Sequence, residues 1–280
     1  MNTYINFNGR TISSGTPIVS ADNRGFRYGD GIFETIRISA GKIILASSHF
    51  DRLFSGIKLL RFEQPSFFTA EVLNRQILDL CKKNNHLQSA RVRLVIYRGE
   101  GGLYDSPDPF PNHIIQTWDL PLSGTQINEN GWVIDVFPGG RKSPDIFSNL
   151  KSNNYLLYSM AALYAMENHF SDCLLLNTQG RICDSTVANI FCRKNNIIFT
   201  PPLSEGCVAG VIRRHLLEKR KIGVYEIQEA EIEPGFLESA DEVFLTNAIQ
   251  GIRWVNRLGA KSYDPSAAHF IYDTIIKNLS

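Results

Sequence analysis

Three residues of this chain carry side chains that could do chemistry: an amine, a carboxylate and a guanidinium. Lys151 lies in NLKSNNYLLYSM, just ahead of an apolar helical stretch. Asp184 lies in GRICDSTVANIF, at the entry to an apolar strand, and Arg52 lies in SHFDRL, on a predicted helix. Each residue alone is more typical of a solvated helix start, a turn residue or a surface arginine, so the chemistry depends on what accompanies them.

A local anion site is indicated by the segment TPPLSEGCVAGVIRR, which has glycines at 206 and 210 where a helical pattern starts. Glycine lets the backbone approach a ligand closely, and the first N–H groups of a helix favour an anion. The segment is not a P-loop, because the lysine and hydroxyl of G-x-x-x-x-G-K-[ST] are missing. Taken alone, it predicts an ordinary helix start.

The order and context of these segments resemble a known family. DNRGFRYGDGIFETIR (22–37) is similar to the signature D-x-G-F-x-Y-G-D-G-x-F-E of the class IV aminotransferases, the fold-type IV enzymes that use pyridoxal 5′-phosphate (PLP). The family includes branched-chain and D-amino-acid aminotransferases and 4-amino-4-deoxychorismate lyase. The resemblance covers roughly residues 2–256 and continues, in the family's order, through SHFDRL, LKSNNYL, GRICDSTVANIF, TPPLSEGCVAGVIRR and EVFLTNAIQGI.

The resemblance implies roles toward the cofactor. Lys151 would form the covalent link to PLP and later act as the base that moves the Cα proton. The Tyr155 hydroxyl would hydrogen-bond the phenolic oxygen. Asp184 matches the acid that faces the pyridine nitrogen and keeps it protonated, so that the ring accepts electrons. The residues implied on the phosphate side are Arg52, the backbone N–H groups of Val211 and Ile212, and the turn that contains Asn247 and Ala248.

Three positions depart from the family pattern. At 184 the family usually has Glu, and Asp is shorter by about 1.5 Å. Many aminotransferases offer a hydroxyl to the phosphate where this chain has Ala248 and Ile212. We therefore expect the anion to depend more on Arg52 and on backbone amides.

Substrate recognition is predicted from five residues. Tyr28, Phe33 and Arg37 match pocket positions of the branched-chain enzymes. Arg91 and Arg93 lie two apart on a predicted strand and so share a face, where two guanidinium groups suit a dicarboxylate. The alternative for this pair is an exposed, charged strand face.

The elements that must position these residues follow an α+β pattern. Short apolar runs predict strands, and helical spacing predicts helices over 49–60 and 67–83, the second capped by Ser66. Segment 121–131 is polar and contains Pro and Gly, so we predict a linker there, a smaller domain over 1–120 and a larger one over 132–280. The family implies the fold-type IV architecture, with two α/β domains joined by a linker. The predicted strands are 2–8, 32–38, 43–46, 91–97, 112–118, 132–137, 173–177, 187–192, 196–199, 224–227, 242–246 and 252–255, and the later helices are 153–168, 207–220 and 266–278.

Composition excludes several classes of protein. Hydrophobic residues make up 43% and charged residues 20%, which is ordinary globular usage. With 29 basic and 28 acidic residues, the net charge of +1 gives no general attraction to nucleic acid or to an anionic membrane. No apolar stretch has the length of a membrane span, and the five cysteines, without a C-x-x-C pair, are typical of reduced thiols in the cytoplasm. No metal site is expected, because the histidines show no ligand spacing.

The sequence therefore favours a PLP-dependent aminotransferase that transfers an amino group from an amino acid, with branched-chain donors considered, to a 2-oxo acid. The first alternative is 4-amino-4-deoxychorismate lyase, which releases pyruvate and 4-aminobenzoate. A further alternative is a non-catalytic PLP-binding protein, motivated by Asp184. The resemblance also implies a homodimer. The sequence leaves open which substrate is used and whether L- or D-amino acids are used.

Overall fold

The computed structural model describes residues 4–104 and 108–279, and the chain divides into two compact units. The first unit takes in the described residues up to Gly124 together with Leu150–Tyr155, and the second contains Thr125–Asn149 and Leu156–Leu279. The division lies inside the segment 121–131. The return of Leu150–Tyr155 to the first unit has no counterpart in the predicted domains. The described residues do not include 1–3, 105–107 and 280. Parts of the two predicted domains and of the strand predicted over 2–8 therefore lie outside the described residues.

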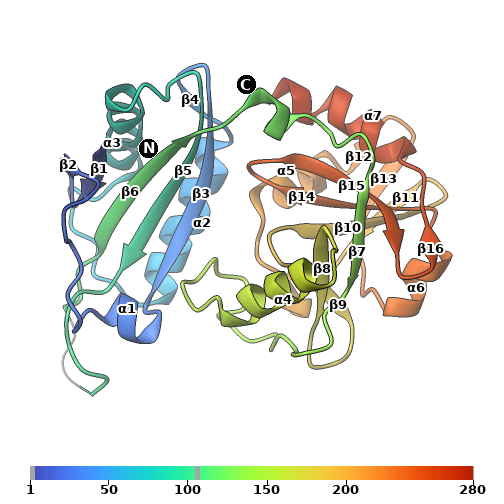
Figure 1. Cartoon of the computed structure of the whole chain (residues 1–280), viewed down its shortest axis with the longest axis horizontal. Coiled ribbons are helices and arrows are strands. Elements are labelled where there is room, and N and C mark those ends of the chain that lie inside the picture. The colour runs from blue at the N-terminus through green and yellow to red at the C-terminus, as the bar shows by residue number, and fades with distance from the viewer. Residues whose placement is uncertain (1–3, 105–107, 280) are drawn as a thin grey trace. The chain divides into compact units, whose positions relative to one another are not determined.

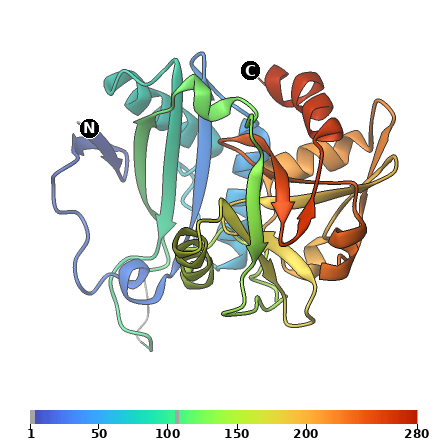
Figure 2. The same cartoon turned by 45° about the vertical axis from the view of Figure 1, so that its right-hand side comes forward.

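The first unit is a sheet with helices on one face (Figure 1). Within the described residues its six strands pair antiparallel in the order β2-β1-β6-β5-β3-β4. The extended segment between β2 and α1 is visible in dark blue (Figure 2). Its elements are β1 (Tyr4–Phe7), β2 (Arg10–Ser13), α1 (Arg24–Tyr28), β3 (Gly31–Ser39), β4 (Lys42–Ile43), α2 (Ala46–Leu59), α3 (Ala70–Lys83), β5 (Ser89–Tyr97) and β6 (Asn112–Asp119).

Alternation along β3 and β5 builds the core of this unit. Ile36 of β3 and Leu94 of β5 are fully buried against Leu53 of α2 and Leu73 of α3, and each such side chain contributes about 1.5–3 kcal/mol. The helix predicted over 67–83 begins later, at Ala70, because the Thr69 side chain, not Ser66, accepts the capping bond from Val72 N at 3.3 Å.

The second unit is built on a mixed sheet of ten strands among the described residues. The order is β12-β13-β11-β10-β14-β15-β7-β8-β9, with β16 paired to β15. Strands β7–β8, β7–β15 and β11–β13 pair parallel and the other pairs are antiparallel. The elements are η1 (Leu122–Thr125, across the boundary), β7 (Trp132–Val136), α4 (Leu156–Glu167), β8 (Asp172–Leu176), β9 (Ile182–Ser185), β10 (Asn189–Lys194), β11 (Ile197–Thr200), η2 (Leu203–Glu205), α5 (Val211–Lys219), β12 (Lys221–Ile222), β13 (Tyr225–Glu229), α6 (Pro234–Ser239), β14 (Glu242–Asn247), β15 (Gly251–Leu258), β16 (Lys261–Ser262), α7 (Ser266–Thr274) and η3 (Ile276–Asn278).

The mixture of helices and antiparallel and parallel strands confirms the predicted α+β class. Within residues 4–104 and 108–279, no helix is both long and apolar enough to cross a membrane. The same residues contain no group of three or more His, Cys, Asp or Glu side chains that could hold a metal ion. All five cysteines are buried and free.

Candidate active site

Lys151 lies in a short segment that pairs with the start of β3. Phe33 N donates to Lys151 O at 2.8 Å, and Asn153 N donates to Gly31 O at 2.9 Å. A side chain at Gly31 would prevent this pairing, because its Cβ would overlap Ile96 O and lie 2.6 Å from Asn153 Nδ2. The last glycine of GDG therefore lets the lysine segment reach the sheet.

The Lys151 ammonium is surrounded by aromatic rings of its own unit. Its Nζ lies 4.5 Å from the Phe33 ring centroid and 5.8 Å from that of Tyr155. The two rings meet edge to face with centroids 5.6 Å apart. The Arg93 guanidinium carbon lies 4.0 Å from the centroid of the same Phe33 ring. The structure thus brings together four residues that were predicted separately.

The predicted arginines share one face of the first sheet. Arg37 of β3 lies directly opposite Arg91 of β5, and Arg93 lies two residues along on the same face. Arg91 is exposed and stacks on Trp118, 5.6 Å from the ring. Burial, and secondarily the charge of Arg91, lowers the pKa of Arg93. The face is therefore an electropositive surface beside Lys151.

Tyr28, the remaining predicted substrate residue, ends the short helix α1 and is 38% exposed. The guanidinium carbons of Arg24 and Arg27 lie 5.3 and 5.2 Å from its ring centroid. Tyr28 is thus partly exposed, next to two arginines.

Arg52 is held in place by a buried acid and a histidine. Arg52 Nε and Nη2 donate to the two carboxylate oxygens of Glu34, the first at 2.7 Å, and His49 Nδ1 lies 2.6 Å from Glu34 Oε2. Burial raises the pKa of Glu34, but the Arg52 charge and the His49 contact outweigh burial and lower that pKa to about 2. The fork fixes the guanidinium that was predicted to meet a phosphate.

Asp184, on β9 of the second unit, is 2% exposed and hydrogen-bonded at both oxygens. Val208 N donates to Oδ2 at 2.8 Å, the Tyr158 hydroxyl donates to Oδ2 at 3.0 Å, and Asn189 Nδ2 donates to Oδ1 at 3.1 Å. Lys142 Nζ forms an ion pair with Oδ2 at 3.4 Å. Burial raises the pKa of Asp184, and Lys142, Val208 N–H and Tyr158 oppose that rise.

The N-terminus of α5 has no side-chain cap among the described residues. Its N-cap is Gly210, which has no side chain to occupy the first N–H groups. Val211 and Ile212 have apolar side chains, so their backbone amides are the hydrogen-bond donors that these two residues can offer. The Asn247 side chain is committed to its own turn, since its Oδ1 accepts from Ile249 N and Gln250 N at 3.0 and 2.8 Å. Ala248, in that turn, offers no hydroxyl.

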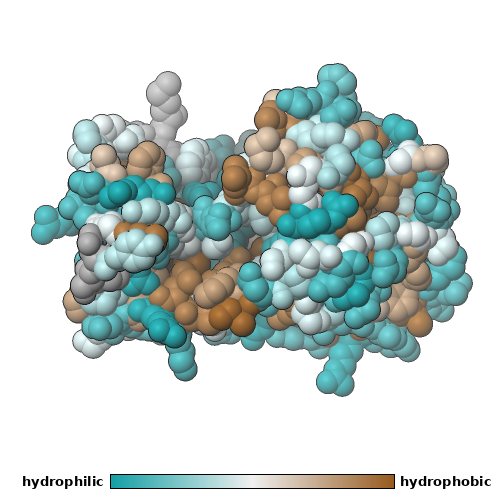
Figure 3. All heavy atoms as spheres, turned by 90° about the horizontal axis from the view of Figure 1, so that it is seen from below, coloured by the Kyte–Doolittle hydropathy of each residue, from teal (hydrophilic) through white to brown (hydrophobic). Residues whose placement is uncertain are grey.

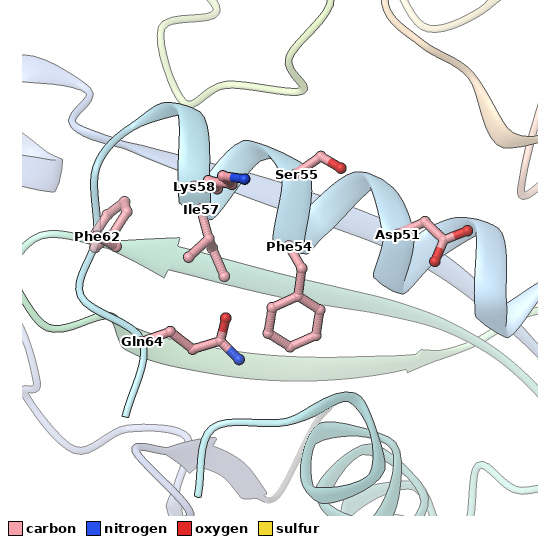
Figure 4. Close-up of a pocket in the computed structure, with 7 residues that line it drawn as sticks. All are labelled: Asp51, Phe54, Ser55, Ile57, Lys58, Phe62 and Gln64. Carbon is pink, nitrogen blue, oxygen red and sulfur yellow. The ribbon is translucent and has the colours of Figure 1, made fainter. Parts of the chain in front are cut away.

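A hollow on the first unit lies apart from these residues. Its volume is about 600 Å³, and Figure 4 shows Phe54, Ile57, Phe62 and Gln64 around it beside α2. None of its lining residues is a predicted site residue.

The comparison with protein families decides the identity of the chain. The family described as amino-transferase class IV matches residues 31–258. The chain belongs to the class IV aminotransferase family. Class IV aminotransferases are PLP-dependent enzymes.

Relatives of this chain are named for two different activities. A putative branched-chain-amino-acid aminotransferase of Methanocaldococcus jannaschii is 30% identical over 86% of this chain and 83% of its own length. An aminodeoxychorismate lyase of Bacillus subtilis is 29% identical over 97% of this chain and 94% of its own length. The solved Escherichia coli branched-chain amino acid aminotransferase has a TM-score of 0.86, 24% identity and coverage of 97% and 93%, which supports the fold. The expected fold-type IV fold is thus confirmed, and the linker over 121–131 stays a prediction.

The side chains of this class IV chain fit PLP by their chemistry. The first unit offers the Lys151 amine for the aldehyde and the Arg52 guanidinium for the phosphate. The second offers the uncapped N-terminus of α5 for the phosphate and the buried Asp184 carboxylate for the ring nitrogen. These are the groups that an aldehyde, a phosphate and a basic nitrogen require.

The sequence reasoning assigned no role to the residues that support Arg52 and Asp184. Glu34 is the last residue of the signature and points to the face opposite Phe33. His49 lies three residues before Arg52 on α2 and so on the same side of the helix. These are signals that could have paired the three residues. Lys142 and Tyr158 carry no such signal, because only the tertiary structure brings them to Asp184.

Proposed function

We propose that this chain is a PLP-dependent aminotransferase that moves an amino group from an amino acid to a 2-oxo acid. The observation that carries this proposal is that the ring centroid of Phe33, which matches a pocket position of the branched-chain aminotransferases, lies 4.5 Å from Lys151 Nζ and 4.0 Å from the Arg93 guanidinium carbon. This arrangement places the Lys151 amine, which can exchange with the amine of an amino acid, near the Arg93 guanidinium, which can bind a carboxylate. The 30% identical relative is likewise named a putative branched-chain-amino-acid aminotransferase.

The residues that the family resemblance names would serve the cofactor. PLP, when bound, supplies an aldehyde that condenses with amines and a ring that accepts the electrons released at Cα. The Lys151 amine would hold and move the Cα proton, and Phe33 and Tyr155 would keep water from it. Arg52, fixed by Glu34, and the amides of α5 would bind the phosphate. Asp184 would stabilise positive charge at the ring nitrogen.

The arginine face supports a dicarboxylate as one partner. Arg37 and Arg91 lie directly opposite each other, so a second carboxylate could be bound beyond the one at Arg93. A 2-oxo dicarboxylic acid, such as 2-oxoglutarate, is the acceptor we propose, and branched-chain amino acids are among the donors.

A lyase that cleaves aminodeoxychorismate is the second candidate. Two observations favour it: the Bacillus subtilis lyase aligns over 97% of this chain, and the Ala248 turn lacks the hydroxyl of many aminotransferases. Aminodeoxychorismate is itself a dicarboxylate, so the arginine face suits either substrate. The non-catalytic alternative gains no support from the relatives compared above.

The products separate the two candidates. We expect a panel of L- and D-amino acids with 2-oxoglutarate or pyruvate to yield the aminated acceptor in amounts equal to the oxo acid formed. Replacing Arg91 with Ala should raise KM for the dicarboxylate more than for a monocarboxylate. Arg75→Ala, at an exposed arginine of α3, is the matched control and should change neither. Release of pyruvate and 4-aminobenzoate from aminodeoxychorismate without acceptor, and no acceptor amination, would replace the aminotransferase by the lyase.

A further inference from the structure

Lys142 is a buried lysine to which the proposed reaction gives no role. Its backbone is fixed beside the end of β8, since its N donates to Leu176 O at 2.9 Å and its O accepts from Thr178 N at 3.0 Å. Its side chain is 10% exposed. An ammonium group so far from water requires polar partners, and the fixed backbone limits where they can be.

The partners of Lys142 form a closed triangle. Its Nζ donates to the Tyr158 hydroxyl of α4 and lies 3.4 Å from Asp184 Oδ2, while the Tyr158 hydroxyl donates to the same Oδ2 at 3.0 Å. Nζ also lies 5.0 Å from the Tyr158 ring centroid. The tyrosine thus holds the lysine and the aspartate together.

The donors are shared unequally between the two carboxylate oxygens of Asp184. Among the described residues, Oδ2 receives Lys142, Tyr158 and Val208 N, whereas Oδ1 receives Asn189 Nδ2. This arrangement fixes the rotation of the carboxylate and leaves Oδ1 with capacity to accept a further bond.

Lys142 supplies the charge in this arrangement. The other titratable groups facing Asp184 are Tyr158 and the thiols of Cys183 and Cys207. Burial raises the pKa of both thiols, that of Cys207 to about 12, so they are neutral at physiological pH. The ammonium of Lys142 is therefore the positive charge that pairs with Asp184 among the residues the structure describes.

We propose that Lys142 is a positioning residue for Asp184: its ammonium group orients the buried carboxylate, favours its charged form and thereby limits how tightly a shared proton is held there. The orientation and charge of Asp184 are properties of the protein alone. An effect of Lys142 on the ring nitrogen of PLP rests on the proposed function. If Asp184 shares a proton with that nitrogen, the positive charge of Lys142 also acts on the shared proton.

The test is the titration of Asp184 in the cofactor-free protein. The carbonyl stretch of its protonated carboxyl group can be followed by infrared spectroscopy over pH and assigned by its loss in Asp184→Asn. Lys142→Met keeps the bulk of the chain and removes the charge, so the titration midpoint should rise by about 1–3 pH units. Lys142→Arg should keep the midpoint near the wild-type value.

Lys219→Met, at an exposed lysine of α5, controls for the loss of one positive charge and should leave the midpoint unchanged. If Lys142→Met does not fold, Lys142→Gln replaces it, because its amide can still donate to Tyr158. A midpoint that is the same in wild type and in the neutral variant would overturn the proposal. If the midpoint rises but PLP is not bound through Lys151, the positioning role stands and the proposed function fails.

Discussion

At the scale of single residues, the site depends on buried charges that are paired before any ligand binds. Arg52 is forked onto Glu34, and Asp184 is anchored by four donors among the described residues. Leaving one member of such a pair alone in the interior costs more than the pair contributes. Variants at these positions therefore test stability and chemistry together.

Glu34→Gln should destabilise the protein at neutral pH by on the order of 3 kcal/mol, because Arg52 loses its ionised partner. The pKa of Glu34 is lowered from 4.5 to about 2 in the folded state. Its stabilising effect is therefore present above pH 4.5 and lost as pH falls toward 2. Urea unfolding of both proteins over pH 2–7 should show curves that converge on acidification. Asp79→Asn, at an exposed acid of α3, should run parallel to wild type; a constant gap for Glu34→Gln would contradict the pairing.

Asp184→Asn should lower turnover by about 10²–10³ while changing PLP affinity far less. We expect the phosphate contacts and Lys151 to hold the cofactor, and the Asp184 carboxylate to act mainly on charge that would develop during proton removal at Cα. Steady-state kinetics measures the turnover, and a PLP titration measures the affinity. Asp184→Glu tests whether the shorter side chain of Asp limits its contact with the ring nitrogen. Wild-type turnover in Asp184→Asn would show that the acid does not face the ring nitrogen.

At the scale of elements, close approach of backbone segments decides where the site can form. The N-cap of α5 meets β10 at Asn189, whose Nδ2 bonds both Asp184 Oδ1 and Val208 O, at 3.1 and 2.8 Å. A Cβ at Gly210 would overlap Asn189 Oδ1. The absence of a side chain at Gly210 thus allows the N-terminus of α5, where we propose that the phosphate binds, to lie against the residue that holds Asp184.

Gly210→Ala should weaken PLP binding and lower the melting temperature, because Asn189 must leave its bonds. The backbone at Gly210 has φ −66°, so the effect is steric and not conformational. Gly235→Ala, where a Cβ meets nothing within 4 Å in helix α6, is the matched control and should be neutral or slightly stabilising. If the two variants behave equally in thermal unfolding and PLP titration, Gly210 has no special role in the site.

Alternation and helical spacing predicted the long elements well. The strands expected at 32–38 and 91–97 occur as β3 and β5 because their apolar residues alternate against a helix-covered face. Short elements such as α1 and β9 were not predicted, because four or five residues are too few to show a periodic pattern of apolar residues. The ion pair between Lys142 and Asp184 joins residues that no local pattern connects, so it could not be predicted from the sequence.

At the scale of the whole molecule, apolar side chains reach the surface, as the view in Figure 3 shows. Leu156, Met160 and Leu163 are 70, 46 and 39% exposed at helical spacing along α4. A stripe of this kind is typical of an interface. The family resemblance predicts a homodimer, and this stripe is the surface we expect a second copy to cover.

Met160→Glu combined with Leu163→Lys should therefore shift the protein from dimer to monomer without changing its net charge. Light scattering coupled to size-exclusion chromatography measures the mass. Replacing the exposed Val224, which is 63% exposed in the second unit, with Thr is a control that should stay dimeric. A monomeric wild-type protein would end the dimer proposal.

The central claim is that Lys151 binds PLP, and mass spectrometry after borohydride reduction tests it most directly. The wild-type protein saturated with PLP should be yellow before reduction. After reduction it should carry a phosphopyridoxyl group on Lys151. Lys151→Ala should lose both the colour and the adduct, whereas Lys142→Met should keep them, because the Lys142 ammonium is engaged by Tyr158 and Asp184. An adduct on another lysine, or none in PLP-saturated protein, would contradict the account.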